Sequence, residues 1–490
     1  MKKAVVIGSG FAGMSAASFM AKAGWEVTVL EKHDMPGGRC RMYQQDGFTF
    51  DMGPSWYWMP DVFERYFNCF GKKVNDYYQL TRLDPSYRVF YPDGPIDIPA
   101  DYAALRQLFE SIETGSAEKL DQFMKEAAYK YEVGINKLVH KPGLQWNEFI
   151  DMDLAKGLLK LDVFTSMKKH IRKFFSNSKL RQLMEFPVLF LGALPEHIPA
   201  LYSLMNYADI QLGTWYPQKG MYEIPKAMHQ LAVELGVKFE FNCTVSKIVV
   251  NNGKAKAVLA GNNVFEADVV IGGADYHFIE HQLLDQEHRS YSENYWEKRV
   301  MAPSCLLYYI GLSKKLNNVT HHALFFDVDF ELHGNEIYSD PKWPTEPLFY
   351  TCIPSVTDNT VAPNGGENLF FLIPVAAGIQ GDDEQLRDFY FDKIISRFET
   401  QTGNSIRDAI VHKRTYAVSD FVNDYNAFKG NAYGLANTLL QTSILKPSLK
   451  SKKVNNLFYT GQLTVPGPGV PPSLISGEVV AKEINKIFQP

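Results

Sequence analysis

The sequence predicts an α/β protein in which a discontinuous domain with a parallel sheet carries a second, mixed α/β domain built from two insertions. Three observations predict this fold class. Residues 4–31 read as strand, glycine-rich loop, helix and strand. Residues 222–271 alternate between helical and strand patterns, and residues 457–487 give a strand, a loop and a helix. Two long segments separate these blocks, so the pieces of one sheet are expected to lie far apart in the sequence.

The N-terminal block carries a dinucleotide-binding fingerprint. Residues 4–7 are typical of a strand buried on both faces, residues 14–23 read as a helix, and residues 26–31 read as a second strand. In the intervening loop Gly8 allows the tight turn, Gly10 lets the backbone approach a pyrophosphate, and Gly13 permits close helix–strand packing. Glu31 ends the second strand, where a carboxylate binds ribose hydroxyls and repels a 2′-phosphate. The block therefore predicts a Rossmann-like site that disfavours NADP.

The later blocks supply the rest of the predicted sheet. Residues 222–234 read as a helix, 237–250 as strand-rich, 251–253 as a hairpin turn with 254–259 as its partner strand, and 267–271 as a buried strand. Residues 457–460 predict a strand, 461–472 a Pro/Gly-rich loop and 473–487 a helix. We expect residues 1–85, 215–299 and 451–490 to form the discontinuous domain, and residues 86–214 and 300–450 to form the second domain.

Composition and charge restrict the class of protein. The 50 Lys and Arg residues against 55 Asp and Glu residues give a net charge of −5, which argues against a nucleic-acid binder. The five cysteines are far apart and indicate neither a disulfide framework nor a zinc ribbon. Residues 4–7 are too short for a signal-peptide core, and no apolar run is long enough for a transmembrane helix. We expect a cytoplasmic protein, or one that lies on a membrane from that side.

The sequence gives little support for a metal site or a catalytic nucleophile. His277 and His281 have helical spacing, but no Glu follows His277 and no third ligand is evident, which favours a solvated helix face over a zinc site. Cys40 has no nearby disulfide partner and reads as a packed thiol. The sequence has no G-x-S-x-G elbow and no P-loop. We therefore expect no metal and assign no catalytic residue.

A second glycine-containing segment follows the second strand. Gly37-Gly38-Arg39 would let a loop pass over a diphosphate with a guanidinium in reach, although an exposed loop arginine is the alternative. Asp51-Met52-Gly53-Pro54-Ser55 comes shortly after it. In this order the residues resemble the bacterial phytoene desaturase (carotenoid desaturase) family, within the flavin amine oxidase superfamily, whose pattern runs G-x-G-x-x-G, strand-Glu, G-G-R and D-x-G-P-[ST].

Two further segments carry the resemblance. The run from Tyr216 to Met221 is similar to the family's Y-P-x-G-G-M, with Lys219 in place of the first glycine. The run from Thr460 to Ser473 resembles the family's C-terminal signature of a strand, a glycine and then H/V-P-G-x-G-[IV]-P before a helix. Amine oxidases end in a different, Glu-containing pattern, whereas the residue after Gly461 is Gln462.

The resemblance implies an FAD-dependent carotenoid desaturase whose insertion domain walls a tunnel for a long apolar polyene. The C-terminal loop would aim N–H groups at the flavin and its ribityl-phosphate arm. The strand residue Val245 would hold the adenine through its backbone. The residues implied to bind FAD are Gly8, Ser9, Gly10, Ala12, Gly13, Glu31, Lys32, Gly38, Arg39, Gly53, Pro54, Ser55, Val245, Gly461, Gly469, Val470, Pro471 and Ser473.

Phytoene, desaturated in successive steps, is the expected substrate, and oxygen or a quinone is the expected electron acceptor. A hydroxycarotenoid desaturase, a carotenoid ketolase and a carotenoid isomerase are alternatives. An amine oxidase and a non-enzymatic prenyl-binding escort protein are more distant alternatives.

A membrane surface is an expected partner, because a long hydrocarbon dissolves in the bilayer. Residues 161–175 place apolar side chains at 163, 167, 171 and 174 beside Lys168, Lys169, Arg172 and Lys173. This pattern fits either a basic amphipathic helix on an anionic membrane or a surface helix packed on the core. Residues 186–194 fit a tunnel mouth or the core. We expect a peripheral protein on the cytoplasmic face.

Overall fold

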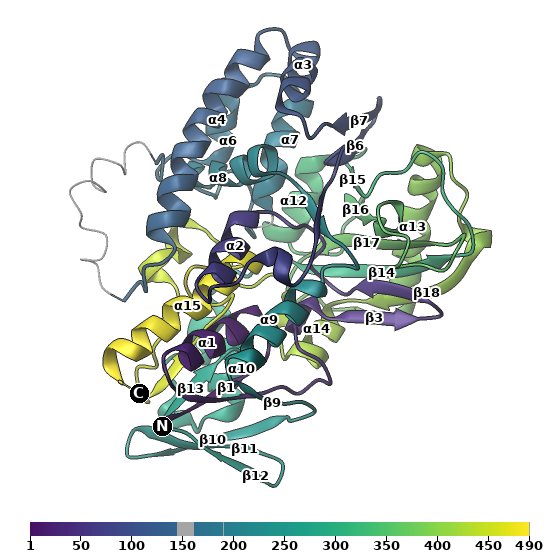
Figure 1. The fold of residues 1–490 in the computed structure, drawn as a ribbon. Coiled ribbons are helices and arrows are strands. Elements are labelled where there is room, and N and C mark those ends of the chain that lie inside the picture. Colours follow the sequence, from purple (N-terminus) through teal and green to yellow (C-terminus); the bar gives the residue numbers. More distant parts are fainter. Residues whose placement is uncertain (145–160, 190, 490) are drawn as a thin grey trace.

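A parallel sheet of five strands forms the lower part of the computed structural model, which describes residues 1–144, 161–189 and 191–489 (Figure 1). Every adjoining pair of strands is parallel. The spatial order is β19 (Leu457–Tyr459), β13 (Val269–Gly272), β1 (Lys3–Ile7), β2 (Glu26–Leu30) and β9 (Lys238–Glu240). The sheet thus combines strands from all three sequence blocks, and the predicted α/β class is confirmed.

The two faces of this sheet are covered differently. Val6 and Val29 face the helices α1 (Phe11–Lys22), α9 (Glu223–Glu234) and α15 (Val470–Ile487). Val5 and Leu30 instead join the core under the antiparallel strands β10 (Val245–Asn251), β11 (Lys254–Ala260) and β12 (Asn263–Glu266). This alternation is what a strand buried on both faces requires.

Helices α1 and α15 each begin three residues before the predicted start. Gly10 and Gly469 occupy the N-cap positions. In α15 the first turn contains Pro471 and Pro472, which a helix tolerates there because first-turn N–H groups have no partner within the helix. The first turn of α15 was not predicted because its glycine- and proline-rich sequence is typical of a loop.

A sheet of seven described strands lies beside the parallel domain (Figure 1). Its pairs are antiparallel, except that β15 pairs with β6 in parallel. One face packs on α13 (Glu384–Thr402), and the other face joins the main core. The order is β18 (Ile410–Tyr416), β14 (Ser304–Leu312), β17 (Glu367–Val375), β16 (Phe349–Cys352), β15 (His322–Phe325), β6 (Tyr87–Tyr91) and β7 (Gly94–Ile98).

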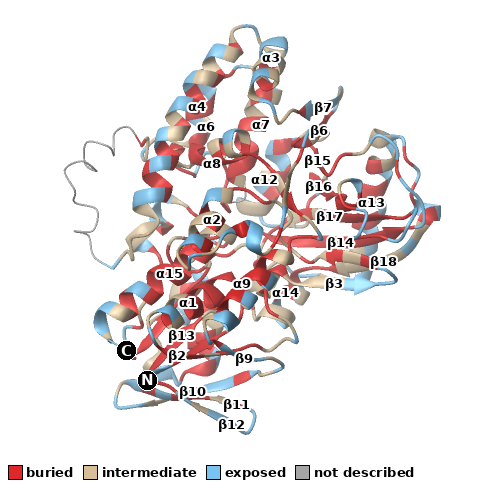
Figure 2. Cartoon of the chain, in the orientation of Figure 1, coloured by how far each residue is buried: buried red, intermediate tan, exposed pale blue. Residues whose placement is uncertain are grey.

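A group of helices stands at the top of Figure 1. It contains α3 (Tyr102–Ile112), α4 (Ser116–Val133), α6 (Met167–Phe174), α7 (Ser178–Leu189) and α8 (Leu204–Asn206). The apolar residues Met167, Ile171 and Phe174 of α6 are buried. Figure 2 colours the chain by burial and shows buried segments in this group of helices. Of the two interpretations of residues 161–175, the surface helix packed on the core is therefore correct, and this apolar face is not free to enter a membrane.

The remaining elements connect the larger layers. They are α2 (Pro60–Asn68), α10 (Tyr276–Phe278), α11 (Glu293–Glu297), α12 (Phe330–Tyr338), α14 (Val418–Tyr425), the β3–β4 pair (Met42–Gln45, Phe48–Asp51) and the β5–β8 pair (Leu80–Arg82, Trp215–Pro217). Among the described helices, none combines the length and apolarity needed to cross a bilayer. Within the apolar stretch 186–194, residue 190 lies outside the described chain, Phe186 and Val188 are buried, and Leu191 borders the cavity described below.

Candidate functional site

A cavity of about 390 Å³ begins at the carboxyl ends of β1 and β2 and continues to the seven-stranded sheet. At the end next to the parallel sheet, Gly10 and Glu31 border it. Trp58, Leu307 and Leu372 border its apolar end. One space thus joins a polar region at glycine-rich loops to a region lined by aromatic and aliphatic side chains.

Most of the residues predicted to bind FAD border this cavity. Ser9 and Gly13 do not, because Ser9 is fully buried behind the loop and Gly13 packs against the strand. The structure brings the others together from four separate segments. They are Gly8, Gly10, Ala12, Glu31, Lys32, Gly38, Arg39, Gly53, Pro54, Ser55, Val245, Gly461, Gly469, Val470, Pro471 and Ser473.

The first glycine loop has the geometry of a phosphate site. Gly8 has φ +96°, a left-handed value that favours glycine. A Cβ atom added at Gly13 would lie 2.1 Å from the Gly8 carbonyl oxygen, so only glycine permits this approach of helix and strand. A Cβ atom added at Gly10 would meet no atom within 4 Å, because it would project into open space. The N-terminus of α1 has no side-chain cap, which leaves its first-turn N–H groups for a ligand.

Glu31 is fixed by its neighbours. Its Oε2 accepts hydrogen bonds from the Ser9 backbone N–H and the Ser9 hydroxyl, both at 2.8 Å. Its Oε1 accepts from the His33 backbone N–H at 2.9 Å. The role of Ser9 in this structure is to orient the carboxylate rather than to border the cavity. A carboxylate has further lone pairs, so Glu31 keeps capacity for a ribose hydroxyl.

Arg39 lies in the interior and is not an exposed loop arginine. Its Nη2 donates to the Asn431 carbonyl oxygen at 3.1 Å, and its guanidinium carbon lies 5.2 Å from the centre of the Tyr425 ring. Burial lowers the pKa of Arg39, and the nearby Asp275 carboxylate acts in the opposite direction. Its Nε is buried without a hydrogen-bond partner in the described part of the chain, so a donor remains available beside the cavity.

Asp51 fixes the loop that resembles Y-P-x-G-G-M. Its carboxylate accepts from the backbone N–H groups of Met221 and Tyr222 at 2.8 and 3.0 Å. Burial raises the pKa of Asp51 to about 6, and these two hydrogen bonds oppose the rise. Lys219 has φ +77°, so it adopts the left-handed conformation that a glycine would favour at this place.

The C-terminal loop leads into α15 and is held at both of its ends. Gly461 donates its N–H to the Ser476 hydroxyl at 3.0 Å, which ties the start of the loop to α15. Pro471 and Pro472 carry no N–H, so within the first turn of α15 Val470 is the residue that can donate to a ligand. Gly469 and Val470 border the cavity, so the expectation that N–H groups of this loop reach the flavin stays a prediction.

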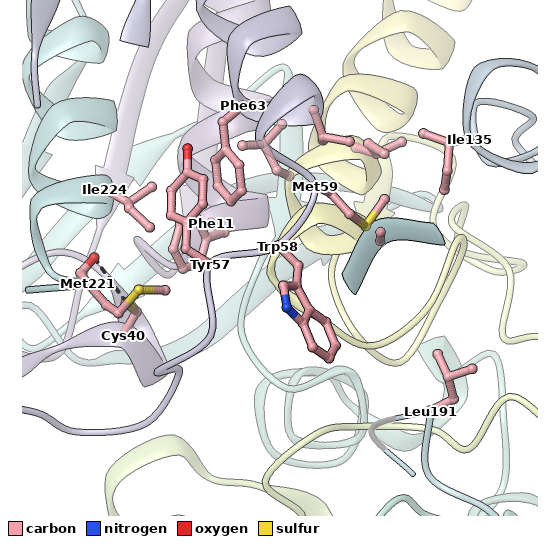
Figure 3. Close-up of a cluster of buried hydrophobic side chains, with 14 of the residues drawn as sticks. Phe11, Cys40, Tyr57, Trp58, Met59, Phe63, Ile135, Leu191, Met221 and Ile224 are labelled. Atoms are coloured by element: carbon pink, nitrogen blue, oxygen red, sulfur yellow. Dashed lines mark hydrogen bonds between the residues drawn. The ribbon is translucent and has the colours of Figure 1, made fainter. Parts of the chain in front are cut away.

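Trp58 and Met59 belong to the apolar lining, although no sequence motif identified them. These two neighbouring residues and Leu191, from the stretch 186–194 that the sequence left as tunnel mouth or core, lie around one space, as Figure 3 shows. Tyr350 of β16 borders the same region, and its hydroxyl donates to the Ser55 hydroxyl at 3.0 Å. No local motif marks such residues, because it is the packing of the two sheets that brings them together. Cys40, also in Figure 3, is a buried thiol whose Sγ donates to the Met221 carbonyl oxygen.

The residues at the polar end fit a flavin dinucleotide. Three features suit a pyrophosphate: the open space at Gly10, the uncapped start of α1, and Arg39 Nε, which has no partner among the described residues. Glu31 at the end of β2 suits a ribose, and the adjoining apolar end of the cavity leaves room for a ring system and a substrate.

Comparisons with known proteins agree with this geometry. Residues 11–485 match the family of flavin containing amine oxidoreductases. The chain is 40% identical over 481 residues to a carotenoid 3,4-desaturase of Haloarcula japonica, a match that covers 98% of this chain and 97% of that protein. It is 30% identical over 490 residues to a zeta-carotene-forming phytoene desaturase of Myxococcus xanthus, covering 99% and 94% of the two chains.

Among solved structures, an oxidoreductase from Methanosarcina mazei superposes on this chain with a TM-score of 0.63 at 16% sequence identity. The match covers 98% of this chain and 100% of that chain. At this identity the likeness shows the fold alone. FAD is the cofactor of this oxidoreductase chain. The resemblance found in the sequence is confirmed: the chain belongs to the carotenoid desaturases within the flavin containing amine oxidoreductase family.

Proposed function

We propose that the protein is an FAD-dependent desaturase that introduces successive conjugated double bonds into phytoene. The observation that carries the proposal is one continuous cavity that joins the glycine loops to an apolar lining. The relative from Myxococcus xanthus, named a phytoene desaturase, supports the choice of substrate. The residues implied to bind FAD that border the cavity are proposed to hold it here, while Ser9 orients Glu31 and Gly13 allows α1 to pack closely on β1.

The chemistry explains why no charged substrate clamp is needed. Each step removes two hydrogens from adjacent carbons of a hydrocarbon, and FAD when bound supplies the acceptor for both electrons. Trp58, Leu307 and Leu372 would hold the polyene by burial of apolar surface and would exclude water. Oxygen or a quinone is the proposed final acceptor.

A second candidate is 3,4-desaturation of a later carotenoid, which the relative from Haloarcula japonica favours. Expression in bacteria that accumulate phytoene, lycopene or a hydroxylated carotenoid separates the two. New absorption bands at longer wavelength in the phytoene strain support the first candidate. Colourless extracts there, with a shifted spectrum in one of the other strains, support the second and reject the first.

We propose that a membrane delivers the substrate to a leucine patch rather than to α6. The patch consists of Leu439, Leu440 and Leu445, whose exposed fractions are 40%, 75% and 40%. The chain segment that carries the patch is tied to the cavity wall, because Thr464, which borders the cavity, donates its hydroxyl to the carbonyl oxygen of Pro447, two residues after Leu445, at 2.7 Å. Exposed apolar side chains on such a segment suit contact with lipid acyl chains.

Co-sedimentation with liposomes tests the patch. Leu440→Asp should reduce the bound fraction several-fold while flavin content stays unchanged. The matched control is Val264→Asp on β12, where the valine is 64% exposed. Equal binding by wild type and Leu440→Asp would reject the patch, while the desaturase proposal would still stand on activity with detergent-dispersed substrate.

A further inference from the structure

We propose that His321, His322 and Cys352 form a binding site for a thiophilic divalent cation, for which Zn²⁺ fits the donor set. His322 begins β15 and pairs with Cys352, the last residue of β16, and His321 directly precedes the strand. One potential ligand atom of each residue lies within 4.8 Å of the other two. All three side chains are buried, with exposed fractions of 4%, 0% and 3%.

The hydrogen bonds of Tyr350 determine the tautomer of His322. The Tyr350 hydroxyl donates its one proton to Ser55 Oγ, and its oxygen lies 2.7 Å from His322 Nδ1. The shared proton of this second contact must then belong to Nδ1. His322 Nε2 consequently carries a lone pair, and it has no hydrogen-bond partner among the described residues.

His321 has a similar arrangement. Its Nδ1 lies 2.8 Å from the Thr357 hydroxyl oxygen, and its Nε2 is buried with no partner in the described chain. Burial lowers the pKa of His321 to about 3 and the pKa of His322 well below its usual value. An imidazole binds a metal in its neutral form, through a ring nitrogen that carries a lone pair. A hydroxyl at Nδ1 of each ring is the kind of second contact that orients a metal-binding histidine.

Cys352 completes the donor set. Burial raises the pKa of its thiol, so the sulfur is protonated when no cation is present. Binding would replace the thiol proton with Zn²⁺, form a Zn–S bond and release one proton to the solvent. A Zn²⁺ ion bound by two neutral imidazoles and one thiolate would have a net charge of +1. The carboxylates of Asp51 and Asp358 lie close enough to act electrostatically on Cys352 and His321, respectively, and would partly balance that charge. Ligands of one tetrahedral zinc lie about 3.3–3.6 Å apart, so the ligand atoms would each move inward by less than about 1 Å.

Two other clusters among the described residues have the same types of ligand, but each already contains a basic side chain. In the first cluster, Glu293 lies 3.0 Å from His277 and 2.7 Å from His281, and is the third potential ligand that the sequence did not reveal. However, Arg289 Nη1 lies 3.3 Å from His281 Nδ1 in the same cluster. In the cluster of Glu126, Asp162 and His170, Lys130 Nζ lies 2.9 Å from Asp162 Oδ2 and 3.5 Å from His170 Nε2. The cluster at Cys352 contains no such cation.

An ion at this site would stabilise the wall of the cavity. The Trp56 ring stacks on His322 with centroids 4.2 Å apart and an interplanar angle of 13°, and Trp56 borders the cavity. Tyr350, bonded to the same histidine, also borders it. The proposed role is therefore structural, and it does not depend on which carotenoid is the substrate.

The test is metal binding by the flavin-loaded protein. The protein is dialysed against metal-free buffer and titrated with Zn²⁺ or Co²⁺, and bound metal is measured by mass spectrometry. We expect one tightly bound ion per chain and Co²⁺ absorption at wavelengths beyond the flavin bands. Cys352→Ser should weaken binding by at least about tenfold. Cys69→Ser, which changes a half-buried cysteine at the end of α2, should leave binding unchanged.

A pair of histidine variants distinguishes loss of metal binding from a folding defect. His321→Asn should lose the ion, whereas His333→Asn should retain it, because both ring nitrogens of the buried His333 already have partners in Pro374 and Leu348. Circular dichroism and flavin content identify any variant that fails to fold. Less than about 0.1 ion per chain in the titrated wild type, or equal binding by wild type and Cys352→Ser, would overturn the proposal.

Discussion

The substitution Gly10→Ala separates cofactor binding from folding. Gly10 has φ −71° and ψ 175°, a conformation open to alanine, and the added methyl group would meet no protein atom within 4 Å. The free energy of unfolding of the apoprotein should therefore change by less than about 1 kcal/mol. The methyl group would instead occupy the space in which a pyrophosphate approaches the first turn of α1.

Loss of one charge-assisted hydrogen bond costs about 1.5–3 kcal/mol, which predicts an FAD affinity about 10- to 150-fold weaker for Gly10→Ala. Fluorescence titration of the apoprotein with FAD measures this affinity, and thermal unfolding measures stability. The matched control is Gly13→Ala, whose Cβ would lie 2.1 Å from the Gly8 carbonyl oxygen and should cost about 1–3 kcal/mol of stability. Wild-type FAD affinity in Gly10→Ala, or destabilisation equal to that of Gly13→Ala, would refute the reasoning.

Three further substitutions test buried charges. Glu31→Ala removes the acceptor for three donors, so it should lower flavin retention and cost about 1–3 kcal/mol of stability. The matched control is Glu26→Ala, because Glu26 at the start of β2 is half-exposed and should tolerate alanine. An unchanged flavin content in Glu31→Ala would contradict the role of Glu31. Lys446 is buried beside Asn437, and burial lowers its pKa to about 7. The unfolded chain then binds more protons between pH 7 and 10.5, so wild-type stability should rise with pH across that window, and urea titrations of Lys446→Met should show a smaller rise. The pKa of Asp51 is raised from 3.8 to about 6, so the folded chain binds the extra proton. Wild-type stability should therefore fall between pH 4 and 6, and a slope retained in Asp51→Asn would assign that fall to another group.

The parts of the site that could be predicted from the sequence are those encoded locally. The loop from Gly8 to Gly13 sets its own turn and helix start, and Glu31 follows at a distance fixed by one helix and one strand. The hairpin turn at Asn252 and Gly253 could also be predicted, because these two residues, both with positive φ, determine the turn.

The remaining parts depend on contacts between distant segments. His322 and Cys352 meet only through the register of β15 and β16, and the sequence offered no more than a His-His pair and a lone cysteine. The helix α6 shows the same limit, because its amphipathic pattern is equally compatible with a membrane and with the core that covers it. The bounds of the two domains stay a prediction.

Anaerobic mixing of the yellow, FAD-loaded protein with phytoene-containing liposomes tests the central claim most directly. The account predicts that the flavin absorption bleaches, that one new conjugated double bond forms per flavin reduced, and that admitted oxygen or added quinone restores the yellow colour. Gly10→Ala protein prepared without bound FAD should form no new double bond. A flavin that stays oxidised with phytoene, lycopene and a hydroxylated carotenoid alike would contradict the assignment of this protein as a carotenoid desaturase.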